Sequence, residues 1–358
     1  MKGRQERLGS AVLAASLALM GGCASGPSGR RGASAGVVMP VVDPATRAAV
    51  ESRALGILTA AALGADALLK ANAIEGLHAA PERVEPIVRA ALADDNLGVR
   101  FVAAMTVGTL RLGDSTMFVE PLLRDPAPEV RAAAIYALRR NGVDADPTPL
   151  ATMLESQTMR ERAQAAYILG ELGDRSAVAL LRSAAKRSAP LASKIEDRLA
   201  RLQIAEALVK LGDTDAIETL RAALYPSRPE DLEATALAVQ IIGNVGDRRS
   251  IDQLVYLTAR TGRDRLPAEV RLAAARSMAN LGNRRGSFIA EEFWRDPSPA
   301  IRAQSAFVFG ETVGPDNLSR LTELMEDPSS IVQVSAAAAT LRMLRRDRPS
   351  TAFVDSPR

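Results

Sequence analysis

The chain has 358 residues, enough for two or three ordinary domains or for one long array of repeats. Hydrophobic residues make up 47% of the chain but aromatic residues only 3%, and much of the apolar content is alanine, the strongest helix former. Alternating stretches rich in Val, Ile, Thr and aromatic residues are absent, so we expect an all-α protein. One cysteine and one histidine exclude an intrachain disulfide and a cysteine-based zinc site.

The net charge of +3 is concentrated at the two ends of the chain. Residues 1–22 carry +2, residues 23–43 carry +1 and residues 345–358 carry +2, which leaves −2 for the remaining body. Nucleic-acid binding needs clustered positive charge to neutralise phosphates. The near-neutral body therefore predicts no nucleic-acid partner.

The first 22 residues have the organisation of a secretory signal peptide. Residues 1–7 are basic, residues 8–20 are mostly apolar, and two glycines precede Cys23. The segment from Leu19 to Cys23 resembles a bacterial lipobox, which implies cleavage before Cys23, a lipid on its thiol, and a location in the bacterial envelope. Ala24 in the next position implies the outer membrane, facing the periplasm. An ordinary signal peptide with an incidental cysteine, or an uncleaved anchor, is the alternative.

Three further segments follow the predicted signal peptide. Residues 23–43 are rich in Gly, Ser, Ala and Pro and are typical of a flexible tether. Residues 44–344 contain the repeats, and residues 345–358 form a basic tail that we expect to be disordered.

The body of the chain repeats itself. Residues 125–138 recur as residues 296–307 and, more weakly, as residues 94–104. Alignment on a shared basic position gives nine units with steps of 30 to 39 residues. We call this position the anchor, and it is occupied by Lys70, Arg100, Arg131, Arg162, Arg201, Thr235, Arg271, Arg302 and Gln333. The sequence of each unit predicts two helices. In the fourth unit they cover about residues 149–156 and 159–172, and Gly173 ends the second helix.

The motif Asp-Pro-x-x-x-Val-Arg-x-x-Ala-Ala and the Leu-Gly-Asp ends resemble HEAT repeats, especially the short form called PBS-lyase HEAT-like. This resemblance covers about 300 residues and implies an all-α, right-handed α-solenoid of about nine helix pairs. It also implies that the aspartate and the arginine six residues later form a hydrogen-bonded ladder between neighbouring repeats. The ladder residues in this chain are Asp94 with Arg100, Asp125 with Arg131, Asp296 with Arg302, and the further arginines Arg162, Arg201 and Arg271.

Helical geometry suggests a candidate binding surface on the second helices. Positions 1, 5 and 8 residues after the anchor point away from the predicted core, and the second helix lines the concave groove in HEAT arrays. Four apolar and aromatic side chains then form a strip in units two to four: Phe101, Met105, Tyr136 and Tyr167. Partner binding by this strip is one interpretation, and packing between adjacent second helices is the other.

The sequence contains no phosphate loop, no His-Glu-x-x-His motif and no nucleophile elbow, so we expect no catalytic residues, no metal and no cofactor. His78 is interpreted as a helix-terminal residue. The leading hypothesis is a membrane-tethered scaffold that binds a protein or peptide in its concave groove. One alternative is an enzyme or enzyme subunit of the HEAT-like chromophore-lyase type, and another is a structural spacer.

Overall fold

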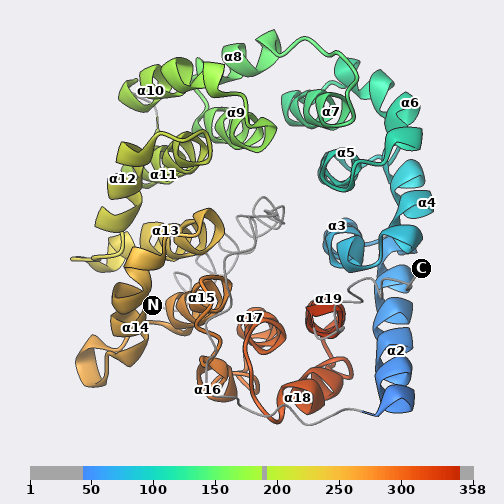
Figure 1. Cartoon of the computed structure of the whole chain (residues 1–358), viewed down its shortest axis with the longest axis vertical. Coiled ribbons are helices and arrows are strands. Elements are labelled where there is room, and N and C mark those ends of the chain that lie inside the picture. Colours follow the sequence, from blue (N-terminus) through green and yellow to red (C-terminus); the bar gives the residue numbers. More distant parts are fainter. Residues whose placement is uncertain (1–42, 188–191, 347–358) are drawn as a thin grey trace, which may run out of the picture.

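The computed structural model describes residues 43–187 and 192–346, and every regular element in these ranges is a helix. The elements form nine pairs that stack into an α-solenoid, as predicted. The outer helices, which face away from the ring centre in Figure 1, are α2 (Pro44–Leu63), α4 (Pro81–Ala91), α6 (Thr116–Val119), α8 (Thr148–Leu154), α10 (Val178–Lys186), α12 (Ile217–Ala222), α14 (Ile251–Ala259), α16 (Ser287–Glu291) and α18 (Asn317–Leu324). The inner helices are α3 (Ala67–Gly76), α5 (Leu97–Leu110), α7 (Pro128–Arg140), α9 (Met159–Leu172), α11 (Lys194–Lys210), α13 (Leu232–Val245), α15 (Ala268–Asn280), α17 (Pro299–Glu311) and α19 (Ser330–Arg346).

The solenoid closes on itself, which the sequence did not indicate. The last helix, α19, packs against both α2 and α3, so the nine pairs form a ring (Figure 1). Polar contacts tie the two ends together: the Arg53 guanidinium lies 2.7 Å from the Glu326 carboxylate, and Arg345 donates to the backbone carbonyl of His78 at 3.1 Å. The inner helices therefore form a closed inner wall.

Local sequence explains where many of the helices begin and end. Asp43 caps α2 by accepting hydrogen bonds from the amides of Ala45 and Thr46, and a proline opens α2, α4, α7 and α17. Gly173 and Gly246 end α9 and α13 with positive φ angles of 76° and 78°, a conformation that glycine adopts without a side-chain clash.

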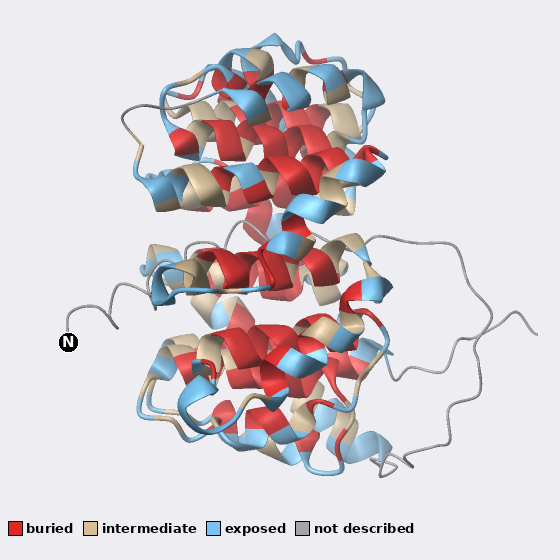
Figure 2. Cartoon of the chain, turned by 90° about the vertical axis from the view of Figure 1, so that its left-hand side faces the viewer, coloured by how far each residue is buried: buried red, intermediate tan, exposed pale blue. Residues whose placement is uncertain are grey.

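One apolar core runs between the inner and outer helices. It extends from Leu58 in the first pair to Leu341 in the last, and Figure 2 shows the buried positions as a band along the helices. Alanine supplies many of these positions, so the helices lie close together with few large side chains between them.

Glycine recurs eight residues after the anchor in every second inner helix. At Gly310 a Cβ atom would lie 2.8 Å from the carbonyl oxygen of Ala339, and at Gly170 it would lie 2.9 Å from the Cα of Ala207. The four glycines are Gly108, Gly170, Gly243 and Gly310. They allow a close approach of α5 and α7, of α9 and α11, of α13 and α15, and of α17 and α19, in that order. The intervening repeats carry larger residues at this position: His78, in the 3-10 helix that follows α3, and Arg139, Val209, Ala279 and Leu341 in their inner helices. The unit of closest helix packing is therefore two repeats.

The predicted ladder exists, but its pairing differs from the expected one. Arg302 donates to the backbone carbonyl of Asp296, six residues earlier, at 2.8 Å, and its carboxylate partner is Asp327 of the next unit, at 2.7 and 2.8 Å. Likewise Arg100 donates to the carbonyl of Asp94 and pairs with the carboxylate of Asp125. The side-chain pairing of Asp94 with Arg100, Asp125 with Arg131 and Asp296 with Arg302 is thus corrected to a bond to the backbone within each unit. The aspartate carboxylate accepts two hydrogen bonds from the anchor arginine of the preceding unit and so joins the two units.

The four other anchor arginines depart from this pattern. Arg131 donates to the carbonyl of Asp125 at 2.7 Å, but the next unit has Ser156 where a carboxylate is expected. The remaining three use other acceptors: Arg162 donates to the carbonyls of Ser156 and Arg187, Arg201 donates to Asp197 and to the carbonyl of Ala185, and Arg271 donates to Glu292. The ladder is therefore irregular where the repeat steps are unequal.

Candidate functional site

Three rows of side chains face the ring centre, at 2, 5 and 9 residues after the anchor. The residue eight after the anchor packs on the following inner helix, and the residue six after the anchor packs on the preceding one, as the contact of Gly310 with Ala339 shows. The residues 2, 5 and 9 after the anchor lie between these two sides of the helix, on the face that points to the ring centre. The fifth-residue row is Glu75, Met105, Tyr136, Tyr167, Glu206, Gln240, Arg276, Phe307 and Ala338. The ninth-residue row is polar in every unit but the first: Ala79, Thr109, Arg140, Glu171, Lys210, Asn244, Asn280, Glu311 and Arg342.

Glu75 is the most perturbed acid of this inner wall. Its side chain projects from α3, the residue is only 8% exposed, and its Oε2 atom has no hydrogen-bond partner. Burial raises the pKa of Glu75 to about 8, although the positive charges of Arg342 and Arg276 oppose the change. The carboxyl group therefore holds its proton at neutral pH, which makes it a proton donor in the range where enzymes work.

Two guanidinium groups share one aromatic ring near Glu75. The Arg276 guanidinium, from α15, lies 4.9 Å from the ring centre of Phe307 on α17, and that of Arg342, from α19, lies 5.8 Å from it. Burial lowers the pKa of Arg276 to about 9, with the charges of Arg342 and Arg346 adding to the effect. This side of the inner wall thus concentrates positive charge.

On α9 and α11 the inner wall carries two carboxylates, Glu171 and Glu206, around one ammonium group. The Lys210 ammonium lies 2.6 Å from the Glu171 carboxylate, 2.7 Å from the Glu206 carboxylate and 5.4 Å from the ring centre of Tyr167. Burial raises the pKa of Tyr167, and the charges of Glu171 and Glu206 raise it further. The charges of Tyr136 and Glu75 make smaller contributions to the pKa of Tyr167 in the same direction.

The predicted apolar strip is not an exposed surface. Tyr136 is 2% exposed, Met105 and Tyr167 are each 8% exposed, and Phe101 is half-buried. Tyr136 packs against Gly108 of the neighbouring helix, where an added Cβ would lie 2.5 Å from its ring. The structure therefore places these side chains in the packing between inner helices, and partner binding by them stays a prediction.

The choice of rows from helical geometry was only partly right. The fifth-residue row faces the ring centre as expected, whereas the first-residue row is buried between helices from Ala132 onward and the eighth-residue row contacts the next helix. The prediction missed the second- and ninth-residue rows. The polar character of the ninth-residue row is visible in the sequence, and it was the signal that could have identified the true inner face.

His78 has a structural position at the seam of the ring. Its Nε2 atom lies 2.9 Å from Thr106 Oγ1, which itself donates to the carbonyl of Val102, so the imidazole nitrogen is the donor in this pair. Burial lowers the pKa of His78 to about 4, and the charge of Arg342 adds to this effect. The imidazole is therefore neutral at pH 7.

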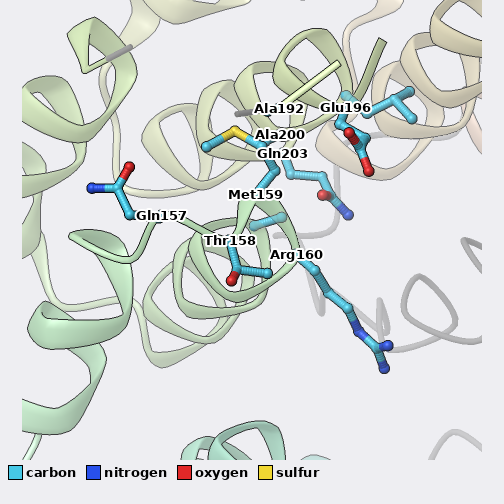
Figure 3. A pocket seen from close by; sticks show the side chains of 10 residues that line it. Gln157, Thr158, Met159, Arg160, Ala192, Glu196, Ala200 and Gln203 are labelled. Atoms are coloured by element: carbon cyan, nitrogen blue, oxygen red, sulfur yellow. The ribbon is translucent and has the colours of Figure 1, made fainter. Parts of the chain in front are cut away.

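A separate cavity of about 350 Å³ lies near the N-terminal ends of α9 and α11 (Figure 3). These helices meet closely at Gly170 and diverge toward Met159 and Ala200, which contribute to the cavity wall. The charged groups of its lining are already engaged, since Glu196 caps α11 through Ser193 and Arg160 lies 3.5 Å from Glu129. The cavity therefore lacks the buried proton donor that Glu75 supplies to the ring centre.

Within residues 43–187 and 192–346, no group of three or more His, Cys, Asp and Glu side chains could hold a metal ion. The helices of these same two ranges include none that is long and apolar enough to cross a membrane. The predicted lipid attachment site Cys23, the signal segment 1–22 and the tether up to residue 42 lie outside the described residues, as does the tail from residue 347.

Family models match the repeats that the structure displays. The model for HEAT repeats matches residues 55–139, and the model for the PBS lyase HEAT-like repeat matches residues 161–187 and 200–225. The chain is a HEAT-repeat protein. HEAT repeats in general mediate protein interactions, and no particular partner follows from the match.

The similar proteins include enzymes. Deoxyhypusine hydroxylase of Schizosaccharomyces pombe (strain 972 / ATCC 24843) is 23% identical over 253 residues, which cover 68% of this chain and 74% of the relative. Human deoxyhypusine hydroxylase in complex with glycerol is 18% identical with a TM-score of 0.36, over 74% of this chain and 96% of that one. The CpcE–CpcF complex of phycocyanin lyase from Nostoc sp. PCC7120 is 18% identical with a TM-score of 0.36, over 73% of this chain and 94% of that one. The two structural likenesses concern the fold alone.

The sequence relative overturns the expectation of a non-enzymatic scaffold. It is named deoxyhypusine hydroxylase. The prediction that the chain is not an enzyme and holds a protein or peptide in its groove is therefore wrong. The sequence relative favours the alternative, an enzyme-type HEAT protein, against which sequence analysis had counted the export signal, the single cysteine and the single histidine.

Proposed function

We propose that this HEAT-repeat protein is an enzyme or an enzyme subunit, and that its reaction centre lies on the inner wall of the ring around Glu75. Two independent observations support the proposal. The curated relative that matches 68% of the chain is an enzyme, and the buried Glu75 carboxyl of α3 is influenced by the charges of Arg276 on α15 and Arg342 on α19, which share the Phe307 ring. Such clusters with perturbed pKa values are typical of active sites.

The observation that carries the proposal is the buried carboxyl of Glu75. A carboxylic acid with a pKa of about 8 keeps its proton at neutral pH and can give it to a bound substrate. Arg276 and Arg342 stand where they would stabilise negative charge that develops on the substrate. Tyr167 adds a second proton-bearing group from the other side of the ring. The proposal assigns no metal to these groups.

The test is an activity screen with the substrate classes that the relatives' names supply. The purified full chain is incubated with a deoxyhypusine-containing protein, and separately with a bilin and apo-phycocyanin. Conversion is followed by intact-protein mass spectrometry and by visible absorbance. We expect conversion of one class, and we expect Glu75→Gln to abolish it because an amide cannot transfer the proton.

The matched control is Glu82→Gln, which makes the same change at an exposed position on the outer helix α4. It should convert substrate as the wild type does. The proposal fails if the wild type converts neither class, or if Glu75→Gln retains the full rate.

We also propose that the chain is held in the bacterial envelope by lipid on Cys23. The support is the signal-like segment before it and the position of the only cysteine directly after Gly21 and Gly22. Multiple acyl chains would give stable attachment, where a single chain gives weak anchoring.

A further inference from the structure

Four neighbouring inner helices present one aromatic ring, two guanidinium groups and one carboxyl group on a continuous stretch of the inner wall. These helices are α15, α17, α19 and α3, and each packs on the next around the ring (Figure 1). Arg276, Phe307 and Glu75 occupy the fifth-residue row of their helices, and Arg342 occupies the ninth-residue row of α19. All four side chains therefore lie on the face that points to the ring centre.

The Phe307 ring is shared by the two guanidinium groups. The guanidinium of Arg276 lies 4.9 Å from the ring centre, and that of Arg342 lies 5.8 Å from it. They come from the two helices that flank α17, so they reach the ring from neighbours on either side. Stacking on an aromatic face limits the movement of a guanidinium group. The two cations are thus preorganised around one ring, which lowers the entropy lost when a ligand binds them.

The charges at this place favour an anion as the ligand. Arg276 and Arg342 are half-buried and repel each other, because both are cations held at the same ring. Glu311 of α17 lies 3.8 Å from the Arg342 guanidinium and also pairs with Arg346, so one carboxylate serves two of the arginines. An anion placed between Arg276 and Arg342 relieves their repulsion, whereas a cation or a neutral group does not.

Glu75 lies one helix further along the wall. α3 meets α19 one turn before Arg342, where a Cβ atom added to Gly76 would lie 2.9 Å from the Cβ of Ala338. Within the described ranges the buried Oε2 atom of Glu75 has no hydrogen-bond partner. Burial raises the pKa of Glu75 to about 8, so its carboxyl is uncharged at neutral pH. It can donate to an oxygen of an anion and does not repel it.

A further arginine of the inner wall has different surroundings. Arg140 of α7 occupies the same ninth-residue row as Arg342. The residues of this row on the adjacent helices are Thr109 of α5 and Glu171 of α9, neither of which is a cation. Arg140 therefore offers one guanidinium in the same row as an acid, whereas Arg276 and Arg342 offer two around one ring.

We propose that Arg276 and Arg342, held around Phe307, bind an oxyanion group of the substrate, a carboxylate or a phosphate. This inference rests on the proposed function, since it names the substrate class of the same reaction centre. The planar fork of a guanidinium group matches the oxygens of both anions. The Phe307 ring would pack against the apolar atoms that carry the anion.

The test is a titration of the full chain with four probes built on one benzene ring. Benzoate and phenyl phosphate are the anions, benzamide is the neutral probe and benzylammonium is the cation. The observable is the Nε–Hε resonances of Arg276 and Arg342 in ¹⁵N-correlated NMR spectra, each identified by its loss in Arg276→Gln or Arg342→Gln. We expect saturable shifts of both resonances with the anions alone, and the tighter anion identifies which oxyanion the site takes.

Arg276→Gln should weaken anion binding by at least about tenfold, read on the resonance of Arg342, because it removes a charged donor. Arg342→Gln should do the same, read on Arg276. The matched control is Arg140→Gln, which makes the same change on the same wall and should leave binding unchanged. Melting curves check that each variant folds. Arg276→Lys keeps the charge and should weaken binding less than Arg276→Gln, because lysine cannot form the fork.

The inference is overturned if benzamide or benzylammonium shifts the two resonances as the anions do, if neither anion shifts them, or if Arg140→Gln weakens binding as much as Arg276→Gln. These outcomes are distinct from failure of the proposed function. That failure would appear as no conversion in the activity screen, or as conversion without need of Glu75, whichever probe binds.

Discussion

Gly310→Ala and Gly56→Ala add the same methyl group to two helices, and the ring predicts opposite effects on stability. Alanine in place of a helical glycine favours the folded state by about 1 kcal/mol, because the unfolded chain loses conformational freedom. At Gly56, on the exposed side of α2, no atom lies within 4 Å of the added Cβ. We therefore expect a gain of roughly 0.5–1 kcal/mol in the free energy of unfolding.

At Gly310 the methyl group meets backbone atoms. It would lie 2.8 Å from the carbonyl oxygen of Ala339, 2.9 Å from its Cβ and 3.0 Å from its Cα, so α17 and α19 must separate. Overpacking of this kind lowers the free energy of unfolding by about 1–3 kcal/mol, and over most of that range the loss exceeds the gain from helix propensity. The expected net effect is a loss of up to about 2 kcal/mol, enlarged if the seam that α19 makes with α2 and α3 also loosens.

Thermal unfolding followed by circular dichroism at 222 nm measures both variants against the wild type. For a chain of this size, each kcal/mol moves Tm by roughly 2–4 °C, so the two variants should move in opposite directions by several degrees. An equal or higher Tm for Gly310→Ala, with Gly56→Ala stabilised as expected, would refute the argument that glycine sets the two-repeat packing.

Four further predictions concern single residues. Burial raises the pKa of Glu75 from 4.5 to about 8 in the folded state, so the contribution of this residue to the free energy of unfolding falls as the pH rises from 4.5 to 8. In urea unfolding, Glu75→Gln should therefore be more stable than the wild type at pH 8, by up to ~4 kcal/mol, and similar to it at pH 4.5. Burial lowers the pKa of His78 to about 4, so wild type should lose stability as pH falls from 6.5 to 4, and His78→Gln should lose less over that range. Arg302→Lys should lower the free energy of unfolding by about 1–3 kcal/mol, because lysine cannot make the bidentate bond to Asp327 of the next unit. Arg131→Lys should lower it less, because the unit after Arg131 has no carboxylate at the matching position. Chemical denaturation of the two variants measures the difference. Cys23→Ser should abolish labelling of the chain by an alkynyl fatty acid in growing bacteria and release it from the membrane fraction, and continued labelling would contradict lipidation at Cys23.

Part of the candidate site was accessible from the sequence. The anchor alignment places Glu75, Tyr167 and Arg276 in one row, and that row does face the ring centre. Sequence analysis selected Met105, Tyr136 and Tyr167 of this row and left its charged members unassigned. The pKa of Glu75 could not be predicted, because it depends on burial in the closed ring and on the charges of Arg342 and Arg276, which lie far along the chain on α19 and α15.

The sequence by itself determined the elements and their order. Spacing of the anchors, proline at helix starts and glycine at helix ends specify nine helix pairs, because these signals act within a few residues of the chain. Only the tertiary structure decided that the pairs close into a ring and that Arg302 binds the carboxylate of Asp327 rather than that of Asp296. Closure is the sum of small rotations between neighbouring repeats, and each rotation depends on how two helices pack, which no local pattern records.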